Sequence, residues 1–251
     1  MGLLMLALAV WGCKGQSAHT AGSVNEMPAK AAIAPDEGAP DSLSVWLGLK
    51  NSNDTLPKPA PVAITEAQFK KYAKNYHPDI DSTESRIIRT PREIQVETAE
   101  QVIHFAADTT DYGQFSYYKG YFPHLKAFIV DDVTADNELS CIVLIDSLSG
   151  KAYWLEAVIC DNSVEIPLPS PGYKYLLAYA NDLYRHSGSF ISIMKISRGK
   201  GFEYTEHSGY TFNDKRVAGI AWIDDANFAI KLVPQDENDT TPAAYYKMRL
   251  R

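Results

Sequence analysis

The chain has 251 residues, of which 45% are hydrophobic and 22% charged, and this length and balance suit one or two globular domains. Its formal net charge is −7, and its Lys and Arg residues form no long run. These charges exclude a nucleic-acid partner and a polybasic lipid-binding patch from the expected functions, because both need a positive surface to meet phosphate groups.

The chain opens with an apolar segment, residues 3–10, which is too short to span a bilayer but is typical of a signal-peptide core. It ends at "VWGC", which resembles the lipobox of bacterial lipoproteins. The resemblance implies that residues 1–12 are a signal peptide and that Cys13 is lipidated and anchors the chain to a membrane. Because Lys14 rather than Asp follows, the expected location is the outer membrane, facing the periplasm or the cell surface. The alternative is a buried N-terminal apolar strand.

Residues 13–62 are rich in Ala, Pro, Gly, Ser and Asn, so they bury little apolar surface and are expected to form a flexible tether. The folded β domain is then expected over residues 63–251. Within the tether, residues 42–50 form an apolar island around Trp46. This island either docks on the domain as a short strand or is a partner-binding peptide held out on the tether.

One helix is predicted directly after the tether. Thr65 followed by Gln68 is a capping-box pattern, and apolar side chains recur at helical spacing from Phe69 to Tyr76. Pro78 ends the helix, since the residue before a proline avoids helical backbone. Residues 79–84, "DIDSTE", resemble the start of a calcium loop but lack its glycine, so an acidic loop is the preferred interpretation.

From residue 93 onward the chain predicts β-strands almost exclusively. Residues 93–122 contain three short strand candidates, and the third concentrates Tyr117, Tyr118 and Tyr121. Alternation places Tyr117 and Tyr121 on one face with Lys119, and Tyr118 on the other. Exposed aromatic side chains of this kind bind partner proteins or sugars, so these tyrosines and Trp46 are the candidate partner-binding residues. The alternative is packing within and between sheets.

Nine further strand candidates follow in three groups of three. They are residues 124–132, 139–146 and 151–158; then 173–182, 189–197 and 201–207; then 216–225, 227–234 and 243–251. The groups begin 49 and 43 residues apart, and all-strand repeats of this length are typical of propeller blades.

Two segments carry a family resemblance. "SPGYKYLLAY", residues 170–179, resembles "SPDGKYLLAY" of the TolB-like and peptidase-associated propellers, with Gly172-Tyr173 where that family has Asp-Gly. Residues 217–230 resemble another blade segment of the same repeats. The expected fold is therefore all-β: three or four propeller-like antiparallel units, as an incomplete propeller or a curved stack of sheets, preceded by one short helix and a disordered tether. The strands of residues 93–122 are the candidates for a fourth, irregular unit.

The first strand of each group ends in a pair of polar residues. The pairs are Asp131-Asp132, Asn181-Asp182 and Asp224-Asp225. If the groups are related by rotation, the pairs emerge on one rim, where their carboxylates would bind a divalent cation or a basic partner. The alternative is that they are turn residues whose side chains accept backbone N–H bonds.

Cysteine use fits an exported protein, because Cys141 and Cys160 remain as an even pair once Cys13 is lipidated. Hairpin register places Cys141 opposite Glu156, so Cys160 lies about 13 Å further along the strand. A disulfide needs Cα atoms within about 7 Å. A Cys141–Cys160 bridge therefore forms only if the chain folds back after Leu155.

The sequence contains no zinc-binding His pair, no nucleophile elbow and no phosphate-binding glycine loop. No catalytic residue and no cofactor are expected. The favoured function is a non-catalytic, propeller-like domain of a cell-envelope lipoprotein that binds a protein or glycan partner, including an inhibitor or immunity type. The alternative is a propeller-like periplasmic hydrolase with a loop-assembled site. A cleft where Asp and His side chains converge from different units would favour the hydrolase.

Overall fold

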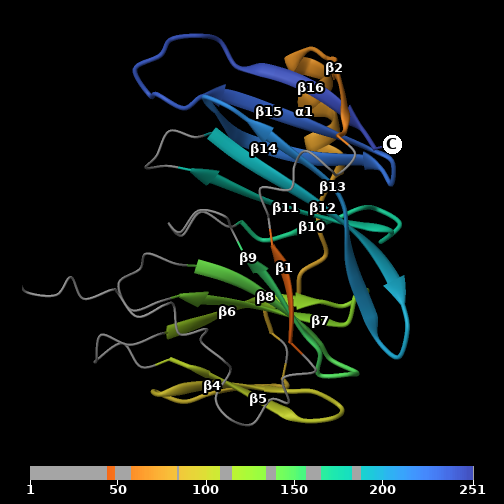
Figure 1. Ribbon diagram of the computed structural model, residues 1–251, viewed down its shortest axis with the longest axis vertical. Helices are drawn as coiled ribbons and strands as arrows, with labels where there is room; N and C mark the ends of the chain where they lie inside the picture. Colours follow the sequence, from red (N-terminus) through yellow and green to blue (C-terminus); the bar gives the residue numbers. More distant parts are fainter. Residues whose placement is uncertain are drawn as a thin grey trace, which may run out of the picture. The chain divides into compact units, whose positions relative to one another are not determined.

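The computed structural model describes residues 44–48, 58–83, 85–107, 115–133, 140–156, 165–182 and 188–250. The predictions at Cys13 and Cys160 fall outside these residues and stay predictions. Within the described ranges the chain forms sixteen strands and one helix, so the all-β prediction is confirmed. The strands make four sheets of propeller-like antiparallel units, whose strands can be followed in Figure 1.

The four sheets follow one another along the chain. The first contains β3 (Ile87–Arg89), β4 (Glu93–Glu97) and β5 (Val102–Ala106). The second contains β6 (Phe115–Phe122), β7 (Ala127–Val133), β8 (Ser140–Asp146) and β9 (Ala152–Glu156), with β1 (Ser44–Gly48) parallel to β9. The third contains β10 (Leu168–Pro169), β11 (Tyr175–Asp182), β12 (Gly188–Arg198) and β13 (Phe202–Phe212). The fourth contains β14 (Lys215–Asp224), β15 (Asn227–Pro234), β16 (Ala244–Arg249) and β2 (Ala60–Ala63).

The nine strands predicted in three groups are β7 to β9, β11 to β13 and β14 to β16. The hairpin register is also confirmed, since Cys141 lies opposite Glu156. Gly150 closes that hairpin at φ +68°, a backbone conformation that glycine adopts without steric cost. The strand candidates of residues 93–122 divide: β4 and β5 form the additional unit together with β3, which was not predicted, while β6 joins the second sheet beside β7.

Three hydrophobic clusters join neighbouring sheets. One lies between the first and second sheets around Val96, Phe128 and Val143; the next, between the second and third, contains Ile129, Leu176 and Met194; the last, between the third and fourth, contains Leu177, Phe228 and Met248. The second and third sheets are therefore buried on both faces. This explains their unbroken apolar runs, whereas β5 alternates between exposed and buried residues because one face of the first sheet packs on the second sheet.

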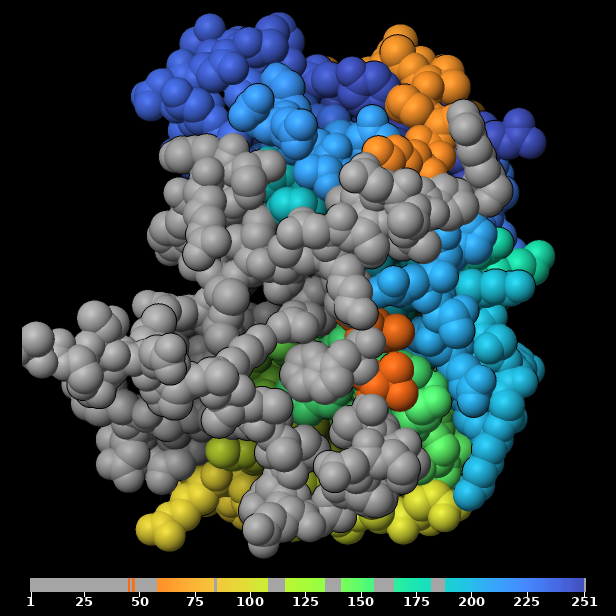
Figure 2. Space-filling model, in the orientation of Figure 1, coloured from red at the N-terminus to blue at the C-terminus, as the bar shows by residue number. Residues whose placement is uncertain are grey.

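The helix α1 (Glu66–Asn75) begins where the sequence predicts. The Thr65 hydroxyl accepts the Gln68 amide at 3.2 Å, and the Gln68 side chain accepts the Thr65 amide at 2.8 Å. Phe69 is buried against the Tyr245 ring, and a side chain at Gly219 would meet the Phe69 ring at 3.1 Å. The helix thus packs on the fourth sheet. In Figure 2 the orange segment that contains the helix adjoins blue residues of the C-terminal part of the chain. Within the described residues, the chain contains no helix with the length and apolar character needed to cross a bilayer.

The segment expected as a tether contains two strands. β1 pairs in parallel with β9 and buries Leu47, so the prediction that the Trp46 island docks as a strand is confirmed. The side chain of Trp46 itself lies outside the described part of the chain. β2 pairs with β16, which places the expected boundary after Val62 inside a strand. The average composition of residues 13–62 concealed these two short pairings.

Candidate functional site at the turn rim

Five hairpin turns gather at one end of the second, third and fourth sheets, and we call them the turn rim. They are residues 123–126, 147–150, 170–174, 199–201 and 225–226. Their contacts cross from sheet to sheet: the Phe202 amide donates to Asp146 at 2.9 Å, and the Gly172 amide donates to Asp225 at 2.7 Å. The rim is therefore tied together by polar bonds as well as by the core beneath it.

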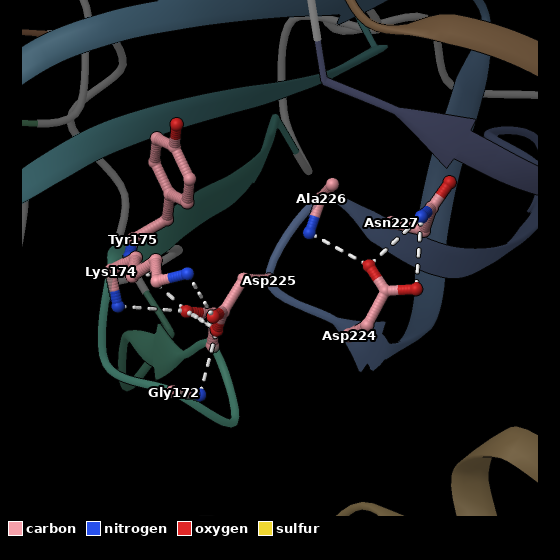
Figure 3. A network of polar contacts seen from close by, with 8 residues as sticks. Gly172, Lys174, Tyr175, Asp224, Asp225, Ala226 and Asn227 are labelled. Carbon is pink, nitrogen blue, oxygen red and sulfur yellow. Dashed lines mark hydrogen bonds and ion pairs between the residues drawn. The ribbon is translucent and has the colours of Figure 1, made fainter.

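Asp225 connects the fourth sheet to the third (Figure 3). Its carboxylate accepts the Ser170 hydroxyl at 2.8 Å and the Gly172 amide, and it pairs with the Lys174 ammonium at 3.3 Å. A Cβ at Gly172 would lie 2.4 Å from this carboxylate, so the contact needs glycine. Partial burial alone would raise the pKa of Asp225, but the bonds from Ser170, Gly172 and Lys174 outweigh it and hold the pKa below its ordinary value.

The neighbouring Asp224 acts within its own turn. It accepts the Ala226 amide at 2.8 Å and the Asn227 side-chain amide at 2.8 Å (Figure 3). Two adjacent acids therefore have different roles: Asp224 closes a hairpin and Asp225 fastens two sheets. Only the bond from the Ala226 amide to Asp224 is the one expected of a turn residue.

The other two polar pairs lie at the opposite end of their sheets. Asp131 and Asp132 are inside β7, where Asp131 pairs with Lys119 at 2.9 Å and buried Asp132 accepts the Ser116 hydroxyl at 2.6 Å. β7 and β11 each follow one strand joined to them by a hairpin, β6 and β10, whereas β14 begins its own run of hairpins. Their ends therefore point away from the rim that β14 reaches.

These pairs do not combine into a metal site in the part of the chain that the structure describes. Asn181 instead bonds across sheets, accepting the Val217 amide at 2.8 Å and donating to the Val217 carbonyl at 3.2 Å. The side chain of Asp182 lies outside the described residues. No three His, Cys, Asp or Glu side chains gather as metal ligands among those that are described.

The three candidate tyrosines do not share one surface. A β-bulge at Lys119 breaks the alternation of β6, so Tyr118 and Tyr121 both face the first sheet while Tyr117 lies opposite Asp131 on the other face. Tyr121 is buried, and the Arg86 guanidinium stacks on its ring. Tyr117 is 47% exposed, with the Lys119 ammonium 5.6 Å from its ring centroid. Of the three, Tyr117 keeps the exposure that partner binding needs.

A second group of side chains converges on the rim from three segments. The His124 and Tyr173 rings lie 4.8 Å apart at an angle of 34°, and the Asp79 carboxylate is 3.8 Å from His124. We call these three residues the Tyr173 cluster. Asp79 and His124 are both about 60% exposed, at 59% and 62%. Burial, with a smaller effect of the Asp79 charge, raises the pKa of Tyr173.

Tyr173 has a left-handed backbone, with φ +54°. It occupies the position that glycine takes in the blade segment the turn resembles. Left-handed backbone costs a non-glycine residue about 1–2 kcal/mol, and such costs are concentrated at functional sites. The departure from the Asp-Gly pattern was therefore the one signal in the sequence that pointed to this cluster.

The remaining described histidines make contacts of three kinds. His77 contacts the Lys74 carbonyl, and His104 contacts Glu93 at 2.9 Å. His207 lies 3.3 Å from the Ser208 hydroxyl, but Ser208 is 1% exposed, so that hydroxyl does not reach a substrate. His104 and Glu93 also meet solvent, but among the described residues only the Tyr173 cluster joins an acid–histidine pair to a second aromatic ring.

The chain was compared with protein-family models, with curated proteins and with solved structures, and none of them matches it.

Proposed function

We propose that this protein is a cell-envelope lipoprotein whose β domain is a non-catalytic binding module for a protein or glycan partner. The observation that carries the proposal is the Tyr173 cluster: two rings and a carboxylate, brought together from three segments on a rim that Asp146 and Asp225 hold in place. His124 and Asp79 are exposed there, and Tyr173 is half-buried beside them. A surface fixed in advance loses less conformational entropy on binding. Recognition side chains are commonly carried by loops that a rigid scaffold positions.

The anchor is the second part of the proposal. The lipobox-like "VWGC" makes Cys13 the lipidated residue, and the chain between Cys13 and β1 then links the membrane to the β domain. Metabolic labelling with a palmitate analogue should mark the wild-type chain in the outer-membrane fraction and leave a Cys13→Ser variant unlabelled. Label that persists in the variant would refute the anchor.

A pull-down with matched variants tests the binding function. Three full-length baits are used. The first is the wild type, the second is the double variant Asp79→Ala/His124→Ala, and the third is the double variant Glu93→Ala/His104→Ala. The third is the control, because Glu93 and His104 form a similar exposed acid–histidine contact on the first sheet. A genuine partner should be retained by the wild type and the control and lost from the Asp79/His124 variant. Equal retention by all three baits would place the binding surface elsewhere.

A hydrolase is the second candidate function, because Asp79 and His124 do come from different segments. An acid–histidine pair of this kind orients a general base. Turnover of fluorogenic ester, peptide or glycoside substrates that disappears in His124→Ala would favour the enzyme over the binding module.

A further inference from the structure

We propose that the Tyr173 cluster binds an arginine side chain of a protein partner. The inference rests on the proposed binding function and specifies the chemistry of the partner. It follows from an arrangement that the protein already contains elsewhere, from the charge of the cluster, and from the backbone of Tyr173.

The chain stacks its own arginine on a comparable pair of rings. Tyr121 and Phe128 lie 5.0 Å apart at 45°, and the Arg86 guanidinium sits 4.8 Å and 4.7 Å from their centroids. The Tyr173 and His124 rings have nearly the same spacing and tilt. The second pair thus reproduces, on the turn rim, the arrangement of rings on which the half-buried Arg86 guanidinium stacks.

Asp79 supplies a carboxylate beside the rings. A guanidinium stacks on aromatic faces and also donates two parallel bonds to a carboxylate, whereas an ammonium is a compact point charge without that planar fit. Asp79 is 59% exposed, so an incoming side chain can reach it. The net charge of −7 further favours a basic partner, since complementary charge accelerates association.

The Tyr173 backbone gives an independent argument that the ring is used. Its left-handed φ of +54° strains a bulky residue, and glycine would relieve that strain. The Tyr173 ring packs only partly against the core between the second and third sheets. A role of the ring in recognition accounts for a tyrosine at a position where glycine would be less strained.

Titration with a defined probe tests the proposal. The full chain is titrated with acetyl-arginine amide and with a tetra-arginine peptide, while NMR follows the ring resonances of Tyr173 and His124. We expect both rings to shift, and we expect the peptide affinity to fall at least tenfold in Asp79→Asn. His124→Phe should retain binding because it keeps a ring, and Glu93→Gln should leave the affinity unchanged as the matched control. Shifts that survive Asp79→Asn, or that map away from the cluster, would overturn the proposal.

A second variant separates recognition from folding. Tyr173→Gly should stay folded and melt near the wild-type temperature, because the relief of backbone strain offsets the lost packing of the ring, yet it should lose the probe. Unchanged probe affinity in this variant would overturn the role of the ring. The two proposals also fail separately. If a partner captured through the cluster is not displaced by the arginine peptide, or is displaced by a neutral glycan, the arginine assignment is wrong and the binding function stands. If the wild-type chain retains no partner at all, the function itself is wrong.

Discussion

The acids of the turn rim are alike in sequence but differ in what they hold. Asp146 is buried and accepts the amides of Leu148, Ser149 and Phe202, the last from the third sheet. Removing it leaves several backbone donors without an acceptor, so we expect Asp146→Ala to lower the free energy of unfolding by about 3 kcal/mol. Asp224→Ala should cost much less, because Asp224 serves an exposed hairpin alone. Urea unfolding measures the free energy of unfolding of both variants. Equal losses of stability would mean that the bond from Phe202 to Asp146 between the sheets adds nothing.

The depressed pKa of Asp225 gives a prediction with a definite sign. Its pKa is lowered from 3.8 in the folded state, so the ionised form stabilises the fold above that value, and this contribution disappears as the pH falls through the folded pKa. Asp225→Asn keeps an acceptor for Gly172 but loses the charge beside Lys174. We expect it to be less stable than wild type by about 1 kcal/mol at pH 7, with the gap closing below pH 4. A gap that widens on acidification would contradict this account.

At the scale of elements, features set by the local sequence were predicted better than features set by pairing between distant segments. The capping box located α1, and turn position with apolar runs located the hairpin of β8 and β9 with its register. The bulge at Lys119 was missed, because the prediction assumed unbroken alternation along β6. One extra residue reverses the faces of all the residues that follow it, so Tyr121 was assigned to the wrong face. The Tyr173 cluster was missed for a related reason: its members are distant in sequence, and only sheet stacking brings their turns together.

β1 offers a test at this scale. Leu47 buries its side chain in the core between the second and third sheets, although β1 is an edge strand. Leu47→Ala should therefore lower the free energy of unfolding by about 2 kcal/mol, at the low end for a buried leucine. Val62→Ala is the control, since Val62 lies on β2 but is 60% exposed, and its melting temperature should stay close to that of wild type. If both variants melt like wild type, β1 makes no contribution to stability.

The whole molecule is a series in which each sheet packs on its neighbours in the chain. The sequence did not show which polar pair lies at the turn rim and which lies at the opposite end of the sheets. The end that a strand reaches depends on how many strands precede it in its run of hairpins. β10 has only two residues, and β6 lies outside the repeated group, so neither was counted as the strand that precedes β11 or β7. Asp131 and Asp225 were therefore assigned to the same end of the sheets. Stacked units of this kind are stabilised mainly by their nearest interfaces.

This arrangement predicts unequal stability along the series. The first sheet packs one face on the second sheet through Val96 and its neighbours, while the second and third sheets are buried on both faces. Amides of β4 and β5 should therefore exchange with solvent through a partial opening, faster than those of β8 and β12, which should exchange near the rate of global unfolding. Val96→Ala should accelerate exchange in the first sheet and spare β15. Met248→Ala, equally buried but in the last interface, should do the reverse. Hydrogen exchange measured by NMR on both variants resolves the two cases, and uniform acceleration in either would show that the four sheets unfold as one unit.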